Sequence, residues 1–403
     1  MESPFWRQTA RPDDSRARGD GLGYRRRMAN REPFSLYEFF AGGGLAGLGL
    51  AGFRTTFAND LDAAKAASWR ANHADPDTLR LADVWDLTPD DLPGHADLAW
   101  ASSPCQDVSL AGARGGLDAR RSGAFWGFWR LMTGLAEQGR APGLIVIENV
   151  MGLLTSNQGR DFAAVCRALR DGGYAFGAVE ADAVLWLPQS RPRLFLIASR
   201  APVAGGVPAG DPFHSARIRA AHAALPDDLK AGWVWWRLDA PPRRNTDLAA
   251  LLQPESSVDW LDEDRAAALL DLLSPLHRAR LDAVLASGER RVGAAYRRVR
   301  VEGGVKVQRL EVRFDGLAGC LRTPAGGSSR QFVVACDEGR VRVRRLTGRE
   351  AARLMGLPDS YRLPAGEVAA LKLMGDAVAV PVVRALSDQI LRPLLDSGVR
   401  TAA

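Results

Sequence analysis

Between residues 34 and 199 the chain alternates short apolar runs with longer stretches of helical spacing. The apolar runs predict strands at 35–40, 54–58, 96–100, 143–147 and 194–198. Apolar positions recurring every three or four residues predict helices at 45–51, 63–73, 125–138 and 162–171. This alternation predicts an α/β fold, a doubly wound and mostly parallel sheet with helices on both faces. Ligands bind beyond the carboxyl ends of the strands in such a sheet, so we expect the chemistry there.

After Pro202 the alternation stops, which predicts a second, smaller domain over 203–345. Short apolar segments at 332–334 and 341–344 flank a turn at 337–339 and predict a hairpin. Thr347 and Glu350 have capping-box spacing and predict a helix that ends near Gly356. Residues 378–395 predict a strand followed by a helix that returns to the first domain. The expected division is therefore 1–33, 34–202, 203–345 and 346–403.

Composition narrows the class of protein. The apolar fraction is 46% and the charged fraction 25%, as in globular proteins, and no run of eighteen uncharged apolar residues predicts a membrane helix. Four distant cysteines without Cys-x-x-Cys spacing and five scattered histidines argue against a disulfide framework or a metal site, and they suit a reducing cytoplasm. The polar stretch 1–33, with eight arginines, predicts a disordered arm or residues upstream of a start at Met28.

Charge is unevenly distributed along the chain. The formal net charge is +6, and residues 278–345 hold sixteen Lys and Arg against seven Asp and Glu. A basic block of this size is a candidate face for contacting phosphates of a nucleic acid. The alternative is an arginine-rich surface that only faces solvent.

A glycine cluster at Gly42, Gly43 and Gly44 follows the first predicted strand and opens a helix. Such a turn lets the backbone approach a ligand, although nicotinamide, flavin, nucleotide and S-adenosylmethionine sites share it, and so do tight turns without a ligand. Asp60, at the end of the next strand, is placed to bind ribose hydroxyls. Asp83 and Val84 are placed to meet an adenine ring. The alternative is that both carboxylates are simply solvated.

Two further strand ends carry a thiol and a carboxylate. Cys105 follows Pro104 and precedes a loop in which glycines alternate with arginines up to Gly123, which resembles a lid over a phosphate backbone. Glu148 ends a strongly apolar strand, where burial raises a carboxyl pKa. Arg191 and Arg193 project to one side if extended and are candidate contacts for a base carbonyl and a phosphate. The alternatives are an inert buried thiol, a carboxylate that caps a loop and an edge strand with solvated arginines.

The order of these motifs resembles the C5-cytosine DNA methyltransferase family of bacterial type. The resemblance is carried by Phe-Ala-Gly-Gly-Gly at 40–44, Asp60, Asp83, Pro-Cys-Gln at 104–106, Glu-Asn-Val at 148–150, Gln-x-Arg-x-Arg at 189–193, the segment 345–361 and Gly-x-Ala-Val at 375–378. It extends from Phe34 to about Leu395, with 203–345 matching as a variable target-recognition domain. Three departures stand out: Gly375-Asp376 replaces the usual Gly-Asn, Cys320 replaces a threonine, and 1–33 has no counterpart.

The resemblance implies an S-adenosyl-L-methionine-dependent DNA (cytosine-5-)-methyltransferase that flips its target cytosine out of duplex DNA. Cys105 would add to C6 while Glu148 holds a proton at N3, and Arg191 and Arg193 would grip the flipped nucleotide. The implied cofactor contacts are Phe40, Gly42, Gly44, Asp60, Leu61, Asp83, Val84, Pro104, Asp376 and Val378. The implied DNA contacts are Gln106, Ser109, Arg121 and Arg322.

The resemblance also implies double-stranded DNA as partner and a restriction-modification or orphan methylase, with a cognate restriction endonuclease as a functional partner. We expect a cytoplasmic, nucleoid-associated monomer that has no membrane partner and no metal. Two alternatives stay open: a tRNA cytosine-5 methyltransferase on the same scaffold, and a catalytically silent DNA-binding regulator.

Overall fold

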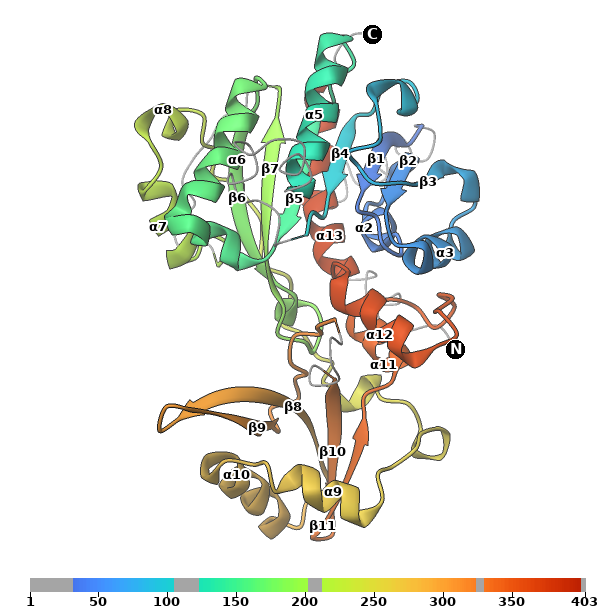
Figure 1. The fold of residues 1–403 in the computed structure, drawn as a ribbon, viewed down its shortest axis with the longest axis vertical. Helices are drawn as coiled ribbons and strands as arrows, with labels where there is room; N and C mark the ends of the chain where they lie inside the picture. The colour runs from blue at the N-terminus through green and yellow to red at the C-terminus, as the bar shows by residue number, and fades with distance from the viewer. Residues whose placement is uncertain (1–31, 105–122, 202–211, 324–329, 400–403) are drawn as a thin grey trace, which may run out of the picture.

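A computed structural model gives the fold, and it describes residues 32–104, 123–201, 212–323 and 330–399. Figure 1 shows two lobes, a large sheet flanked by helices and a smaller sheet at the opposite end of the molecule. The predicted arm at 1–33 falls almost entirely outside the described residues, as does the lid segment 105–122.

The larger sheet has seven strands in the order β3-β2-β1-β4-β5-β7-β6. Its strands are β1 (Phe34–Phe39), β2 (Phe53–Asp60), β3 (Leu79–Leu81), β4 (Leu98–Ala101), β5 (Leu144–Asn149), β6 (Ala175–Asp182) and β7 (Pro192–Ser199). The pairs from β3 to β5 are parallel, and β7 runs antiparallel to both β5 and β6. The expected mostly parallel sheet is therefore confirmed.

Helices cover both faces of this sheet (Figure 1). The helices that surround it are α2 (Leu45–Gly49), α3 (Ala63–Asn72), α5 (Ala124–Glu137), α6 (Arg160–Asp171), α7 (Ala216–Ala223), α8 (Asp227–Lys230), α13 (Val380–Leu386) and α14 (Arg392–Leu394). Helix α5 buries Phe125, Phe128 and Leu131 against one face, while α2 and α13 pack together on the other. Helix α13, in the C-terminal segment, therefore packs beside α2 of the larger lobe, and the expected division into domains stays a prediction.

Several elements differ from the sequence prediction. Strand β6 was not expected, since it is rich in alanine and glycine, which have low strand propensity. The strand expected at the start of 378–395 is wrong, because helix α13 begins at Val380. Pro381 occupies the first turn of α13, where its missing N–H is tolerated, so a valine-rich run forms a helix.

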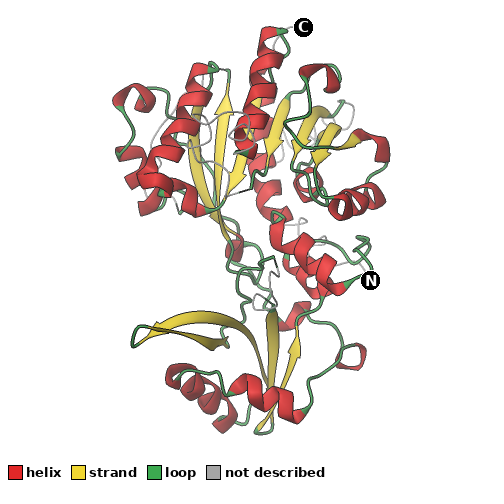
Figure 2. Cartoon of the chain, viewed as in Figure 1, coloured by secondary structure: helices red, strands yellow, loops and turns green. Residues whose placement is uncertain are grey.

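The smaller sheet is antiparallel, in the order β11-β10-β8-β9. Its strands are β8 (Arg291–Glu302), β9 (Val305–Arg313), β10 (Gln331–Asp337) and β11 (Arg340–Arg345), with α9 (Glu263–Leu270) and α10 (Pro275–Ala286) packed on one face (Figure 2). The predicted hairpin is β10–β11 and is confirmed. The capping box of Thr347 and Glu350 is also confirmed, and it begins α11 (Gly348–Leu354), which is followed by α12 (Glu367–Asp376).

The segment between the two sheets packs partly on the larger one. The backbone N–H of Val234 donates to the carbonyl oxygen of Phe176 on β6, and the Trp236 indole N–H donates to that of Ile197 on β7. A domain boundary at 203 therefore stays a prediction. Among the described residues, no helix combines the length and apolarity needed to cross a bilayer.

Candidate active site

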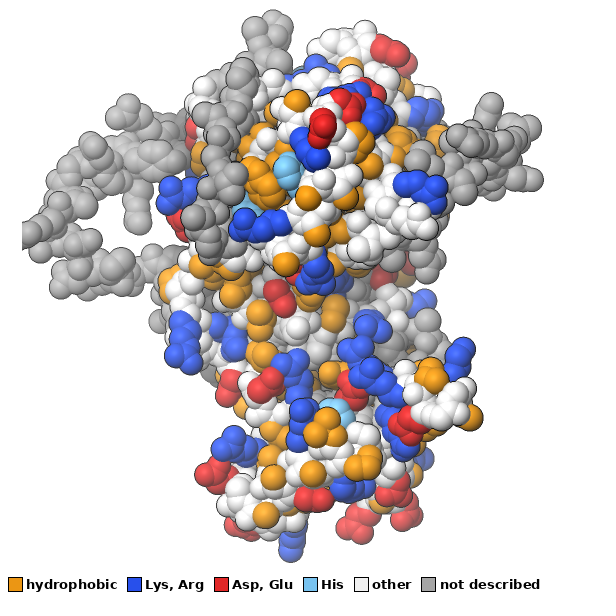
Figure 3. Space-filling model, turned by 90° about the vertical axis from the view of Figure 1, so that its left-hand side faces the viewer, with side chains coloured by type: hydrophobic (Ala, Val, Ile, Leu, Met, Phe, Trp, Pro, Cys, Tyr) orange, Lys and Arg blue, Asp and Glu red, His pale blue; other side chains and the backbone are white. Residues whose placement is uncertain are grey.

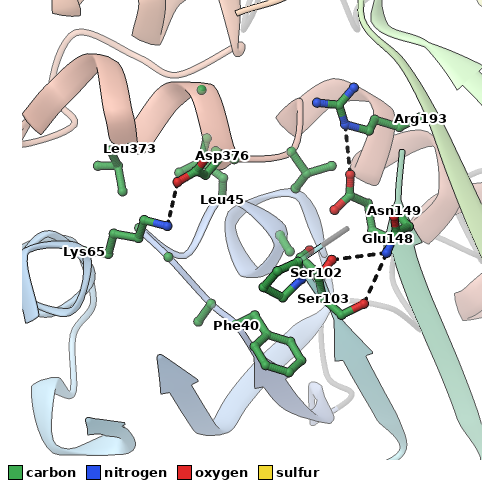
Figure 4. Close-up of a pocket in the computed structure, with 18 of the residues that line it drawn as sticks. Phe40, Leu45, Lys65, Ser102, Ser103, Glu148, Asn149, Arg193, Leu373 and Asp376 are labelled. Carbon is green, nitrogen blue, oxygen red and sulfur yellow. Dashed lines mark hydrogen bonds and ion pairs between the residues drawn. The ribbon is translucent and has the colours of Figure 1, made fainter. Parts of the chain in front are cut away.

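A cavity of about 620 Å³ opens where β1, β4 and β5 end, and it is drawn in Figure 4. Its lining comes from the glycine turn, the loop after β4, the end of β5, the start of β7, residues 320–323 and the C-terminal end of α12. Arg193 belongs to antiparallel β7, and its side chain reaches this edge because the start of β7 lies beside the end of β5. The cavity thus brings together Pro104, Glu148 and Arg193, as the sequence predicts.

Glu148 lies at the inner wall of the cavity and is 6% exposed. Burial raises the pKa of Glu148 above its ordinary value, although Arg193, Arg191 and a hydrogen bond from Ser102 act in the opposite direction. The Nε atom of Arg193 lies 3.2 Å from Oε1 of Glu148 (Figure 4). A raised pKa favours the protonated form of the Glu148 carboxyl group, which is the form that can supply a proton to a ring nitrogen.

Asn149 fixes the loop that leads to the predicted nucleophile. Its amide Nδ2 donates to the carbonyl oxygen of Ser103 at 3.2 Å and to its hydroxyl at 3.3 Å. Ser103 and Pro104 both line the cavity. Cys105, Gln106, Ser109 and Arg121 lie outside the described residues, so their predicted roles stay predictions. Cys105 directly follows Pro104 in the sequence, and Pro104 lines the cavity.

Arg191 lies behind the cavity wall. It is 1% exposed, and its guanidinium donates to the carbonyl oxygens of Leu321 at 2.8 Å, Gly375 at 2.9 Å and Ala377 at 2.5 Å. Burial and the neighbouring Arg193 lower the pKa of Arg191 to about 10, so it stays charged at neutral pH. These contacts hold the Arg191 guanidinium against three backbone carbonyl groups, and its expected grip on the nucleotide stays a prediction.

The glycine turn forms the opposite wall. Gly42 has φ +57°, and a Cβ built on it would meet nothing within 4 Å, so its backbone faces open space. The N–H of Gly42 donates to Asp60 at 2.7 Å, which holds the turn in place. The ring of Phe40 also lines the cavity. Glu38 also belongs to the lining although it is only 1% exposed, and burial raises the pKa of Glu38 to about 7.

Only some of the other predicted cofactor contacts line the cavity. Among the described residues that line the cavity, Asp376 and Val378 appear, whereas Gly44, Asp60, Leu61, Asp83 and Val84 do not. Leu61 is 68% exposed, and the carboxylate of Asp83 accepts from the N–H of Trp85 at 3.0 Å. Val84 is buried in the core. Their predicted cofactor contacts stay predictions.

Sequence reasoning missed Lys65 of α3. Its Nζ lies 2.7 Å from Oδ2 of Asp376, and the hydroxyl of Thr323 donates to the other oxygen of Asp376. All three side chains belong to residues that line the cavity. No motif marks Lys65, because the pair joins positions more than 300 residues apart and only the folded chain reveals it.

Several arginines of the basic block at 278–345 form ion pairs with acidic side chains of the protein. Arg298 and Arg300 both pair with Glu311, and Arg342 pairs with Glu255. On the face drawn in Figure 3, Lys and Arg side chains of the smaller lobe stand beside Asp and Glu. Arg322 lines the cavity, where it is available to a phosphate. Phosphate contacts by this block stay a prediction.

The cavity fits the cofactor that the resemblance implies. S-adenosyl-L-methionine carries a nucleoside, a cationic sulfonium and a zwitterionic amino-acid group. An open glycine backbone, an aromatic ring at Phe40 and the opposite charges of Lys65 and Asp376 suit these three parts in turn. The described residues contain no cluster of three or more potential metal ligands.

Comparisons with known proteins agree with this geometry. The family described as C-5 cytosine-specific DNA methylase matches residues 34–221 and 305–392. Type II methyltransferase M.HpaII of Haemophilus parainfluenzae is 24% identical over 90% of this chain and 91% of its own length. M.NlaX of Neisseria lactamica is also 24% identical, over 89% of this chain and 96% of its own.

Solved structures share the fold. The S. pombe Dnmt2 methyltransferase superposes with a TM-score of 0.58 at 18% identity, covering 90% of this chain and 99% of that one. The Entamoeba histolytica methyltransferase EhMeth gives 0.57 at 12% identity, covering 91% and 99%.

Proposed function

The chain belongs to the C-5 cytosine-specific DNA methylase family, and from that premise we propose that Cys105 and Glu148 form its catalytic pair. The protein is a C5-cytosine DNA methyltransferase with S-adenosyl-L-methionine as methyl donor. The single observation that carries the assignment of residues is the buried Glu148, with its raised pKa, in the same cavity as Pro104.

C5 of cytosine is a poor nucleophile, and it becomes reactive only after another group adds to C6 across the C5–C6 double bond. The Cys105 thiolate forms a bond to C6, and the C5–C6 π electrons move to C5 as Glu148 supplies a proton at N3. When bound, S-adenosyl-L-methionine supplies an electrophilic methyl group for C5. Loss of the C5 proton, return of the N3 proton to Glu148 and departure of the Cys105 sulfur then restore the C5–C6 double bond.

The surrounding residues hold this pair in position. Asn149 fixes the backbone that precedes Cys105, and Arg193 orients the Glu148 carboxyl through their 3.2 Å ion pair. C6 is inaccessible within a duplex, so the target base must be flipped into the cavity. Residues 203–345 then read neighbouring bases, with Arg322 at the cavity edge contacting the DNA backbone.

The proposal also includes a cognate restriction endonuclease as a functional partner. We propose further that the protein is a monomer. The relatives' names call them type II methyltransferases, and this chain covers nearly the whole of their length.

The test has two stages. Bisulfite sequencing of DNA from cells that express the chain identifies the methylated site. A duplex with 5-fluorocytosine at that site should then become covalently bound in the presence of the donor, because fluorine blocks the loss of the C5 substituent and traps the sulfur on C6.

The matched variants locate the sulfur. Cys105→Ser should abolish the adduct, whereas Cys320→Ser, which changes a thiol that lines the cavity, should keep it. An adduct that survives Cys105→Ser would refute the assignment of the nucleophile.

A further inference from the structure

The pair formed by Lys65 and Asp376 lies at one end of the cavity, apart from Glu148 and Arg193 at the other (Figure 4). Lys65 is the third residue of α3, and Asp376 ends α12, so the pair bridges two elements of distant sequence. The side chains of Lys65 and Asp376 are 23% and 38% exposed, so a ligand can reach both.

The electrostatics keep Lys65 charged. Burial alone lowers a lysine pKa, but the carboxylates of Asp376, Asp60 and Asp62 outweigh it and hold the pKa of Lys65 above its ordinary value. Among the described residues, the other basic side chains that line the cavity are Arg193 and Arg322. Arg193 forms an ion pair with Glu148, at the end of the cavity opposite Lys65.

An ammonium beside a carboxylate is the complement of an α-amino acid zwitterion. The ammonium has three N–H donors, and its contact with Asp376 at 2.7 Å uses one of them. Each charge can then bind the opposite charge of a ligand through a charge-assisted hydrogen bond. A ligand bearing only an adenosine group offers neither charge.

We propose that Lys65 binds the carboxylate of the cofactor's amino-acid group while Asp376 binds its ammonium, so that this pair sets the preference for a ligand with an intact methionine end. The inference rests on the proposed function and deepens it in two ways: it adds Lys65, which no sequence motif marks, and it assigns a separate charge of the ligand to Lys65 and to Asp376. The Asp376 oxygen that accepts from Thr323 keeps the carboxylate oriented.

The test measures binding by isothermal titration calorimetry, without any turnover. Three ligands are compared: S-adenosylhomocysteine, its analogue that lacks the carboxylate, and 5′-methylthioadenosine, which lacks the whole amino-acid group. The wild type is compared with Lys65→Met and with Lys372→Met, an exposed lysine on α12 that does not line the cavity.

In the wild type, removing the carboxylate should weaken binding about 10- to 100-fold, the range of a charge-assisted hydrogen bond. In Lys65→Met, S-adenosylhomocysteine should lose the same factor, and removing the carboxylate should then cost nothing further. Binding of 5′-methylthioadenosine should stay the same in all three proteins. Lys372→Met should behave as the wild type.

Three results separate the possibilities. Equal loss of all three ligands in Lys65→Met would overturn the proposal, because it would indicate damage to the fold. Unchanged S-adenosylhomocysteine binding in Lys65→Met would overturn it as well. A wild type that binds none of the ligands would instead contradict the proposed function.

Discussion

At the scale of single residues, three buried glutamates acquire different properties from their surroundings. Glu148 and Glu38 are desolvated, which raises the pKa of each. Glu350 is equally buried, but Arg344 pairs with it and the pKa of Glu350 is lowered instead. Burial alone therefore does not decide the charge of a carboxyl group, and a cationic partner can reverse its effect.

Glu38 should make stability fall as pH rises. Its pKa is 4.5 ordinarily and about 7 in the fold, so between these values the folded state holds a proton that the unfolded state has lost. Between pH 4.5 and 8, the free energy of unfolding of the wild type should fall by about 3 kcal/mol relative to that of Glu38→Gln. Urea unfolding of both proteins at the two pH values measures the difference. A constant difference across this range would contradict the prediction.

At the scale of elements, helix α11 depends on a buried network at its first turn. Glu350 closes the capping box with Thr347, and its two oxygens accept from the Arg344 guanidinium at 2.6 and 2.8 Å. The N–H of Gln253 also donates to Glu350 at 2.9 Å. The network therefore joins β11, α11 and the segment before α9.

Glu350→Gln should destabilise the protein by about 3–5 kcal/mol at pH 7, since it leaves the buried charge of Arg344 without its counter-charge. Because the pKa of Glu350 is lowered from its ordinary value of 4.5, its ionised carboxylate stabilises the fold at pH values above 4.5. This contribution is lost as the pH falls through the lowered pKa. The difference between variant and wild type should shrink near pH 4. Thermal unfolding at both pH values checks this, and an equal difference at both would count against it. Glu263→Gln, at an exposed position in the first turn of α9, serves as a control.

At the scale of the whole molecule, Arg191 fastens three distant segments together. It connects the start of β7 with Leu321, from the chain that leaves the smaller sheet, and with Gly375 and Ala377 at the end of α12. The backbone at Arg322 approaches Gly375 so closely that a Cβ on this glycine would lie 2.5 Å from it. The cavity wall at this point depends on Arg191.

Arg191→Met should therefore lower the free energy of unfolding by about 3 kcal/mol or more, because it leaves buried carbonyl oxygens without donors. Arg200→Met, at an exposed position just beyond β7, should cost less than about 1 kcal/mol. Urea titration of both variants compares them. Equal effects of the two substitutions would show that Arg191 does not fasten these segments.

Several features of the protein could be predicted from local pattern. Strand β5 carries a long apolar run that leads directly to Glu148, so both the strand and the place of Glu148 followed from the sequence. Strand β6 and helix α13 did not follow. Small residues weaken a strand signal, and a valine run has no fixed preference until its neighbours decide how it packs.

The sequence by itself determined the fold class, the order of the motifs and the meeting of Glu148 with Pro104, because strand ends in such a sheet share one edge. Only the tertiary structure decided that Arg191 faces carbonyl oxygens while Arg193, two residues later, faces Glu148. Only the tertiary structure paired Lys65 with Asp376 as well. The physical reason is that these contacts join segments with no common periodicity, so their energies arise only when the whole chain has packed.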